Sequence, residues 1–179
     1  LSWDLLCGRV DRSHPLRPFL LSSGASEGEL DWFTENACSP DLLGVNHYLT
    51  SDRYLDERCE RYPRDLVGGN GRDRYADLDA VRILGDRTGS WTRILGDVWQ
   101  RYRRPIAITE VHLGCTREEQ LRWLLEAWKA AQEARTSGAT VKAVTAWALL
   151  GSFDWNSLLT RAGKHYEPGA FDVRGPAPR

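Results

Sequence analysis

Compact apolar runs alternate with helical apolar periodicity along this chain. The runs "LLGVNHY" (42–48), "IAIT" (106–109) and "TVKAVTAWALL" (140–150) each predict a strand. None of these runs alternates cleanly between apolar and polar residues, which is typical of strands buried on both faces of a parallel sheet.

Helix signals lie before each of the three predicted strands. A capping box of Ser26 and Glu29 opens a short helix through residues 29–35, and a second helix begins at Ser90 and is ended by Pro105. The apolar residues that share one face of this second helix are Ile94, Leu95, Val98, Trp99 and Tyr102.

The clearest helix covers residues 117–136. Thr116 and Glu119 form the capping box at its start, and Gly138 suits its C-terminal cap. We predict that its inner stripe consists of Leu121, Leu124, Leu125 and Trp128, with Trp123 also in the core.

A long polar excursion, residues 51–89, separates the first strand from these helices. It is rich in Gly and Arg, with "GGNG" (68–71) at its centre, and it is too long for a bare connection. Residues 78–84 predict a strand or a helical turn inside it. Strands alternating with helices favour an α/β fold, with a parallel sheet and covering helices.

Composition restricts the partners and the location. The 179 residues carry a net charge of −1, so neither nucleic acid nor an anionic membrane is expected as a partner. No apolar stretch approaches the roughly 20 residues that span a bilayer. The cysteines match no zinc spacing, and we expect reduced thiols in a cytoplasmic protein. They are Cys7, Cys38, Cys59 and Cys115.

The ends of the chain predict a piece of a longer protein. There is no methionine, and residues 174–179 are rich in Pro and Gly, as at the start of a linker. We therefore predict one domain over residues 1–173, followed by that linker.

Polar and aromatic side chains follow all three predicted strands. The carboxyl ends of parallel strands meet at one rim, where functional groups gather. An amide, a phenol, a carboxylate and two indoles at one rim suit a sugar, because polar groups bind its hydroxyls and indoles cover its C–H face. The residues concerned are Asn46, His47, Tyr48, Glu110, His112, Trp147, Asp154 and Trp155.

Simpler roles compete with these. Glu110 could cap the next helix, although Thr116 already provides that cap. Trp147 could belong to the core, and Asp154 could cap a following turn. His47 and His112 have no third ligand beside them, so no metal site is expected. Cys115 stands at a helix start without an evident base, so we expect an inert thiol.

Glu110 and Tyr48 fit the cleavage of a β-glycoside. In that reaction one carboxylate attacks the anomeric carbon, and a second carboxyl group, about 5–5.5 Å away, protonates the leaving oxygen. A phenol hydrogen-bonded to the nucleophile would hold it ionised and oriented.

Three motifs, "GVNHYLTS", "RRPIAITEVHLG" and "AVTAWALLGSFDW", resemble the last three strand-end motifs of the glycoside hydrolase family 1 β-glycosidases. The resemblance covers most of residues 26–173 and implies the C-terminal portion of a (β/α)₈ TIM barrel. It implies no metal or organic cofactor and a carbohydrate as substrate.

The resemblance also implies roles for single residues. Glu110 would be the nucleophile, and Tyr48 would orient it through a hydrogen bond. The residues expected to bind substrate are Asn46, near the sugar's 2-hydroxyl, Trp147, as a stacking platform, and Asp154 and Trp155, at the non-reducing sugar.

The chain departs from the family's pattern at four points. Val111 replaces the Asn that follows the nucleophile, and Asp154 replaces a longer Glu. The family's acid/base, a Glu in an N-E-P motif, has no counterpart, and neither has the Arg that pairs with the nucleophile. We therefore expect the N-terminal half of the barrel to supply the acid/base, and we expect this chain alone to be inactive.

Other phrases, such as "SSGASEGELDWFTE", resemble a bacterial branch in which such a barrel is fused to a dTDP-4-dehydrorhamnose reductase-type domain. One alternative is therefore a non-catalytic module that binds a sugar or sugar nucleotide for that reductase. A second alternative is a structural module that assembles with another copy through an exposed strand edge.

Overall fold

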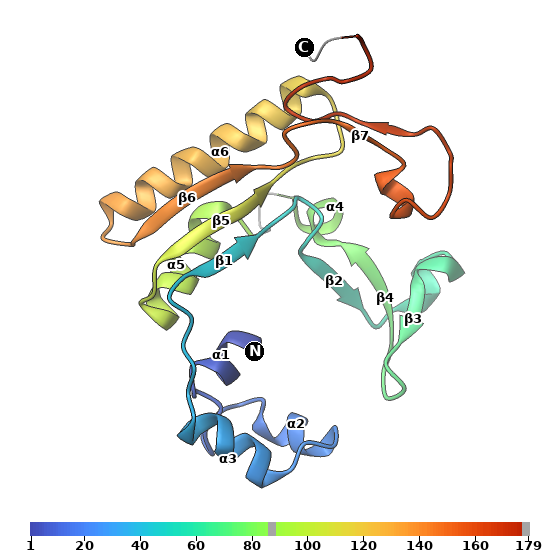
Figure 1. The fold of residues 1–179 in the computed structure, drawn as a ribbon. Coiled ribbons are helices and arrows are strands. Elements are labelled where there is room, and N and C mark those ends of the chain that lie inside the picture. Colours follow the sequence, from blue (N-terminus) through green and yellow to red (C-terminus); the bar gives the residue numbers. More distant parts are fainter. Residues whose placement is uncertain (86–88, 177–179) are drawn as a thin grey trace.

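The computed structural model describes residues 1–85 and 89–176. Its centre is a three-stranded parallel sheet in the order β1 (Leu43–Asn46), β5 (Ile106–Val111) and β6 (Val141–Ala146). Helices α5 (Trp91–Tyr102) and α6 (Arg117–Thr136) cover one face of this sheet (Figure 1). The predicted α/β class with a parallel sheet is confirmed.

The core lies between the sheet and these two helices. Leu95 and Val98 of α5 are buried there, as its periodicity predicts, and Ser90 caps this helix. The helix ends at Tyr102, because Arg103 takes the left-handed conformation with φ 52°. Both predicted capping boxes are present, at the start of α6 and of α3 (Glu27–Glu35).

Helix α6 buries a different face from the predicted one. Leu121, Leu125 and Trp128 are 56%, 47% and 52% exposed, so their assignment to the inner stripe is wrong. The leucines lie in the first half of the helix, whereas the buried face consists of Trp123 followed by alanines, whose small side chains let the second half of the helix approach the sheet closely. The buried residues are Trp123, Ala127, Ala130, Ala131 and Ala134.

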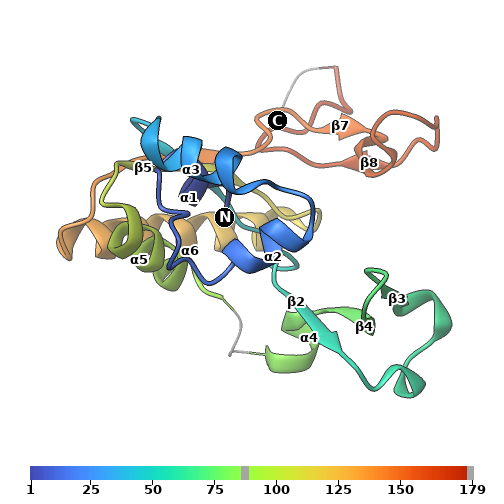
Figure 2. The ribbon, with the colours of Figure 1, turned by 90° about the horizontal axis from the view of Figure 1, so that it is seen from below.

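Residues 51–85 build a small sheet of their own, antiparallel, in the order β2-β4-β3. It stands apart from the parallel sheet (Figure 2). Residues 78–84 include both predicted possibilities, the end of β4 and a helical turn, α4. The elements are β2 (Arg53–Asp56), the 3-10 turns Cys59–Arg61 and Arg64–Leu66, β3 (Val67–Gly69), β4 (Arg74–Asp79) and α4 (Ala80–Leu84).

The C-terminal segment forms a hairpin beside the end of β6. Strands β7 (Ser152–Phe153) and β8 (Tyr166–Glu167) are antiparallel, with the 3-10 turn Trp155–Ser157 between them. All four cysteines are free thiols. None of the helices among the described residues is long and apolar enough to cross a bilayer.

The N-terminal helices are α1 (Ser2–Leu6), α2 (Arg17–Ser22) and α3, and a buried carboxylate joins the first of them to α5. Asp4 accepts hydrogen bonds from Arg101 Nε at 2.8 Å and from the Tyr102 hydroxyl at 3.0 Å. Burial raises the pKa of Asp4, but these hydrogen bonds and the Arg101 charge outweigh it and lower the pKa to about 2.

We expect Asp4→Asn to lower the free energy of unfolding by about 2 kcal/mol at neutral pH, because the ion pair is lost. The folded-state pKa of Asp4 lies below 3.8, so this stabilisation is complete above that value and disappears as the pH falls toward about 2. Urea unfolding of both proteins between neutral and acid pH measures the difference. Asp41→Asn, an exposed aspartate, is the control. An unchanged stability of Asp4→Asn at neutral pH would contradict this account.

Substitutions on the two faces of α6 should differ in how much they lower the free energy of unfolding. Ala127 is fully buried, so Ala127→Leu overpacks the core and should cost about 2 kcal/mol of unfolding free energy. Leu125→Ala, on the exposed face, should cost less than about 1 kcal/mol. Thermal or urea unfolding of the two variants checks this. A larger loss of unfolding free energy in Leu125→Ala than in Ala127→Leu would show that the leucine face of α6 is the buried one.

Candidate functional site

The parallel pairing brings three strand ends to one level. Asn46 of β1 is the register partner of Glu110, and Ala146 of β6 is the partner of Val111. The backbone N–H of Trp147 donates to the Val111 carbonyl at 3.1 Å, which extends this pairing by one residue. An amide, a carboxylate and an indole are therefore neighbours at the rim, as the sequence predicts.

An irregularity in β5 determines where Glu110 points. Regular alternation would place Glu110 on the same face as Ile108, which is buried in the core under the helices. The register with both neighbouring strands shifts between Ile108 and Val111, and Val111 lies in the core again. A bulge of this kind re-aims side chains. It leaves Glu110 only half-buried, away from the core cluster.

Glu110 accepts a hydrogen bond from the hydroxyl of Tyr48 through its Oε2 atom. The pKa of Tyr48 is raised, first by burial, then by this hydrogen bond and by the negative charges of Glu110 and Glu167. Tyr48 therefore keeps its proton and acts as the donor, and the Glu110 carboxylate is the acceptor. This is the contact expected for these two residues.

Asn46 and His47 separate at the end of β1. The Asn46 side chain is exposed beside the sheet and accepts a hydrogen bond from the hydroxyl of Thr109. His47 is buried against Trp91 and Trp123, with ring centroids 5.2 and 5.8 Å away. Burial lowers the pKa of His47, so this histidine is a neutral core residue.

The two indoles predicted at the rim contact each other. The rings of Trp147 and Trp155 are 5.5 Å apart at 61°, and Trp155 is 38% exposed. Asp154 directly precedes Trp155 in the sequence, and its contacts lie within the hairpin turn. Its backbone is left-handed, with φ 60°, and its Oδ1 accepts the His165 backbone N–H at 2.8 Å.

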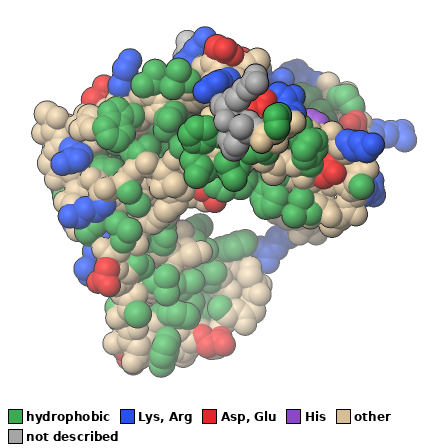
Figure 3. Space-filling view, turned by 45° about the horizontal axis from the view of Figure 1, so that its top comes forward, with side chains coloured by type: hydrophobic (Ala, Val, Ile, Leu, Met, Phe, Trp, Pro, Cys, Tyr) green, Lys and Arg blue, Asp and Glu red, His purple; other side chains and the backbone are tan. Residues whose placement is uncertain are grey.

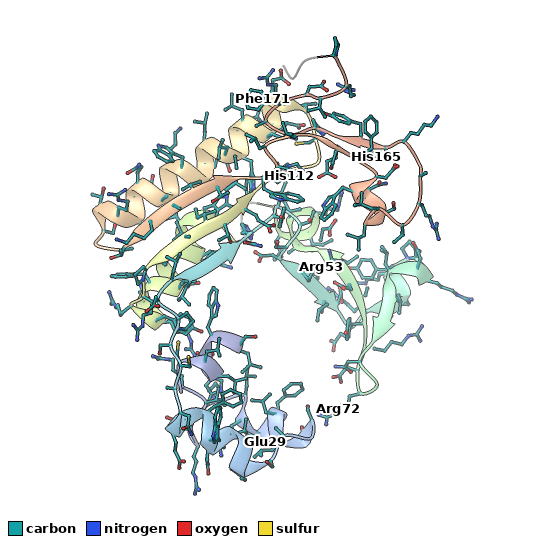
Figure 4. All side chains as sticks on the ribbon, viewed as in Figure 1. Glu29, Arg53, Arg72, His112, His165 and Phe171 are labelled. Atoms are coloured by element: carbon teal, nitrogen blue, oxygen red, sulfur yellow. The ribbon has the colours of Figure 1, made fainter. Side chains whose placement is uncertain are left out.

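One carboxylate of the site was not among the predicted residues. Glu167 of β8 is hydrogen-bonded through Oε1 to Nε2 of His112, at the point where the end of β5 meets the C-terminal hairpin (Figure 4). Nothing in "HYEPG" (165–169) distinguishes Glu167 from a surface residue, because the contact joins positions 55 apart in sequence.

The described residues hold no cluster of three or more metal-ligating side chains. Burial is the first cause that raises the pKa of Cys115, followed by the charge of Glu119, so this thiol is not activated.

Two hollows flank the rim, and Glu110 lines neither. One of about 560 Å³ is lined by Tyr48, Leu113 and Arg122, and one of about 230 Å³ by His112, Arg117 and Trp147, among others.

No family model matches the chain, and no curated protein matches it. Solved structures do match. A β-glucosidase from Thermotoga maritima in complex with noeuromycin has a TM-score of 0.59 at 17% identity, covering 96% of this chain and 39% of its own. The family 1 β-glucosidase from Thermotoga maritima has a TM-score of 0.59 at 18% identity, covering 94% and 38%. The complex of this β-glucosidase with deoxynojirimycin has a TM-score of 0.58 at 19% identity, covering 94% and 37%.

Identities this low show the fold alone. The chain spans less than two fifths of the length of each of these three glycosidases. It therefore has the fold of part of a β-glucosidase, an α/β architecture with a parallel sheet, consistent with a partial barrel.

Proposed function

We propose that this chain is the C-terminal portion of a (β/α)₈ barrel of the family 1 glycosidase type. Among the described strands, β1 and β6 each pair only with β5, so both outer edges of the sheet are open, whereas a closed barrel has no edge strands. The space-filling view shows an opening between parts of the molecule, with hydrophobic side chains along some of its border (Figure 3). The remaining strands of the barrel would pair with these edges.

The reaction we propose for the complete barrel is retaining hydrolysis of an O-β-glycosidic bond. The Glu110 carboxylate attacks the anomeric carbon while an acid protonates the departing oxygen, and water then hydrolyses the glycosyl ester. The acid/base belongs to the N-terminal half of the barrel. The observation that carries this proposal is the hydrogen bond from Tyr48 to Glu110 at the carboxyl ends of parallel strands.

The neighbouring side chains supply a surface for the sugar. Asn46, level with Glu110 on the adjacent strand, would reach the hydroxyl next to the anomeric carbon. Trp147 and Trp155 would cover the C–H face of the ring, whereas Asp154, which the sequence resemblance assigns to the non-reducing sugar, is held in the hairpin turn by the backbone of His165. Because this chemistry proceeds through carboxyl groups, it requires no cofactor.

Two observations favour a second candidate, a sugar-binding module without hydrolysis. Val111 is buried in the core, so no polar side chain follows the nucleophile, and the Asp154 carboxylate is held by the backbone of His165. Such a module would serve a fused dTDP-4-dehydrorhamnose reductase-type domain. Pairing of the open strand edges between copies, as a structural assembly, is a third possibility. The cytoplasmic location stays a prediction.

Covalent labelling tests hydrolysis directly. The longest chain that contains these residues is incubated with 2-deoxy-2-fluoro-β-glycosides of several sugars, and its intact mass is measured. We expect an adduct that maps to Glu110, because the fluorine slows hydrolysis of the glycosyl ester. Glu110→Gln should give no adduct, and Tyr48→Phe should be labelled roughly tenfold more slowly, since one hydrogen bond to a charged group is lost. A folded chain that takes up no label would remove the hydrolase proposal and leave the binding module.

The Tyr48–Glu110 contact has a test that needs no activity. We expect Glu110→Gln to lower the pKa of Tyr48, because the carboxylate that favours the protonated phenol is gone. Ultraviolet difference titration against Tyr48→Phe isolates this tyrosine. Glu118→Gln, an exposed glutamate at the start of α6, is the matched control. An equal pKa in Glu110→Gln and in Glu118→Gln would show that the phenol does not contact Glu110.

A further inference from the structure

The carboxylate expected at the non-reducing sugar, Asp154, is poorly placed for that task. Its Oδ1 atom accepts the His165 backbone N–H, and its own carbonyl accepts the backbone N–H of Ser157 at 3.1 Å and of Leu159 at 3.1 Å. These bonds and its left-handed backbone fix Asp154 inside the turn between β7 and β8. Binding a sugar hydroxyl through Oδ1 would compete with the bond that organises this turn.

Glu167 differs from Asp154 in the partner of its bound oxygen, which is the side chain of His112 and not a backbone N–H of the turn. Its side chain is 16% exposed, so it is largely desolvated yet reachable from solvent. Oε1 is bound by His112, which is itself 6% exposed, and Oε2 has no hydrogen-bond partner among residues 1–85 and 89–176. This second oxygen can accept a hydrogen bond from a ligand hydroxyl or from water.

The surroundings of Glu167 place it within the candidate site. Glu167 is hydrogen-bonded to His112, which stands two residues after Glu110 in the chain. A Cβ built on Gly114, in the loop after β5, would lie 3.9 Å from the Glu167 Cδ atom. The hairpin thus carries this carboxylate over the end of β5.

An indole stands beside the same pair. The ring of His112 contacts Trp147 edge-on, with centroids 5.2 Å apart at 89°. Trp147 in turn contacts Trp155. A carboxylate with a free oxygen, held rigidly next to aromatic faces, is the arrangement that binds a sugar through a hydroxyl and a C–H face together.

We propose that Glu167, oriented by His112, binds a hydroxyl of a β-hexopyranoside through its Oε2 atom, and that Asp154 has a structural role in the hairpin. His112 is a positioning residue, because it fixes the carboxylate without touching the sugar. This proposal rests on the proposed sugar site, but it requires only binding and not hydrolysis.

The test measures binding of defined probes to the longest chain that contains these residues. The probes are methyl β-D-glucopyranoside and methyl β-D-galactopyranoside, with the 3-, 4- and 6-deoxy derivative of each. NMR line broadening or calorimetry gives the dissociation constants. For one deoxy derivative we expect roughly tenfold weaker binding than for its parent sugar, because a hydrogen bond to a charged group is lost.

The variant Glu167→Gln should remove that discrimination. Its affinity for the parent sugar should fall about tenfold, and the deoxy derivative should bind it no worse than the parent sugar does. Asp154→Asn should retain the wild-type ratio between the two sugars, and so should the matched control Glu118→Gln. His112→Asn should weaken binding of the parent sugar, and the ratio should shrink because the carboxylate loses its orientation.

Several outcomes would overturn the proposal. If the difference in affinity between the parent sugar and its deoxy derivative disappears in Asp154→Asn and persists in Glu167→Gln, then Asp154 and not Glu167 binds the hydroxyl. A folded wild-type chain that binds none of the probes, or binds every deoxy derivative as well as its parent sugar, would also refute it. Circular dichroism of each variant establishes folding. Should Glu167→Gln misfold, the deoxy series on Glu167→Asp replaces it, and an unchanged ratio there counts against the proposal.

The result is separable from hydrolysis. If Glu110 takes up no fluoroglycoside label but the deoxy discrimination depends on Glu167, the hydrolase proposal fails and this inference stands. If Glu110 is labelled and the discrimination ignores Glu167, the hydrolase proposal stands and this inference fails.

Discussion

The parallel register of β1, β5 and β6 is the constraint on which the rest of the molecule depends. Parallel strands all end at the same edge, so residues far apart in sequence become neighbours there. Asn46 and Glu110 are register partners across 64 positions, and Trp147 is joined to Val111 by a backbone hydrogen bond. The apolar contacts that fix this register, between the strands and helices α5 and α6, also determine which side chains meet at the rim.

Two carboxylates, Glu110 and Glu167, can lie partly buried at this rim because each is hydrogen-bonded to another side chain. A half-buried carboxylate is costly when unpaired. Glu110 accepts a hydrogen bond from the Tyr48 hydroxyl, and Glu167 is paired with His112 through Oε1, which leaves its Oε2 without a partner among the described residues. The two pairs join three separate segments, the ends of β1 and β5 and the strand β8, so both depend on how these segments pack together. The rim therefore reports on the packing of the whole sheet, and loosening of the C-terminal hairpin would affect the Glu167 pair first.

Much of this arrangement could be predicted from local signals. The strand positions, both capping boxes and the buried face of α5 follow from short-range patterns, and so does the contact between Tyr48 and Glu110 once the strands are taken as parallel. The buried face of α6 could not be predicted from hydrophobicity, because alanines were preferred to leucines where close approach of the helix mattered. Glu167 could not be predicted either, since only the hairpin's docking gives it a partner.

Val111 shows how the core and the site restrict each other. The bulge after Ile108 turns Glu110 out of the core, and its second consequence is that Val111 points into it. A polar residue at position 111 would have to be buried at 4% exposure without a partner, so an apolar one is favoured there. A polar neighbour for Glu110 must then come from another element. Tyr48, which follows β1, is the polar neighbour that the structure gives Glu110, and the C-terminal hairpin adds Glu167 beside His112 at the end of β5.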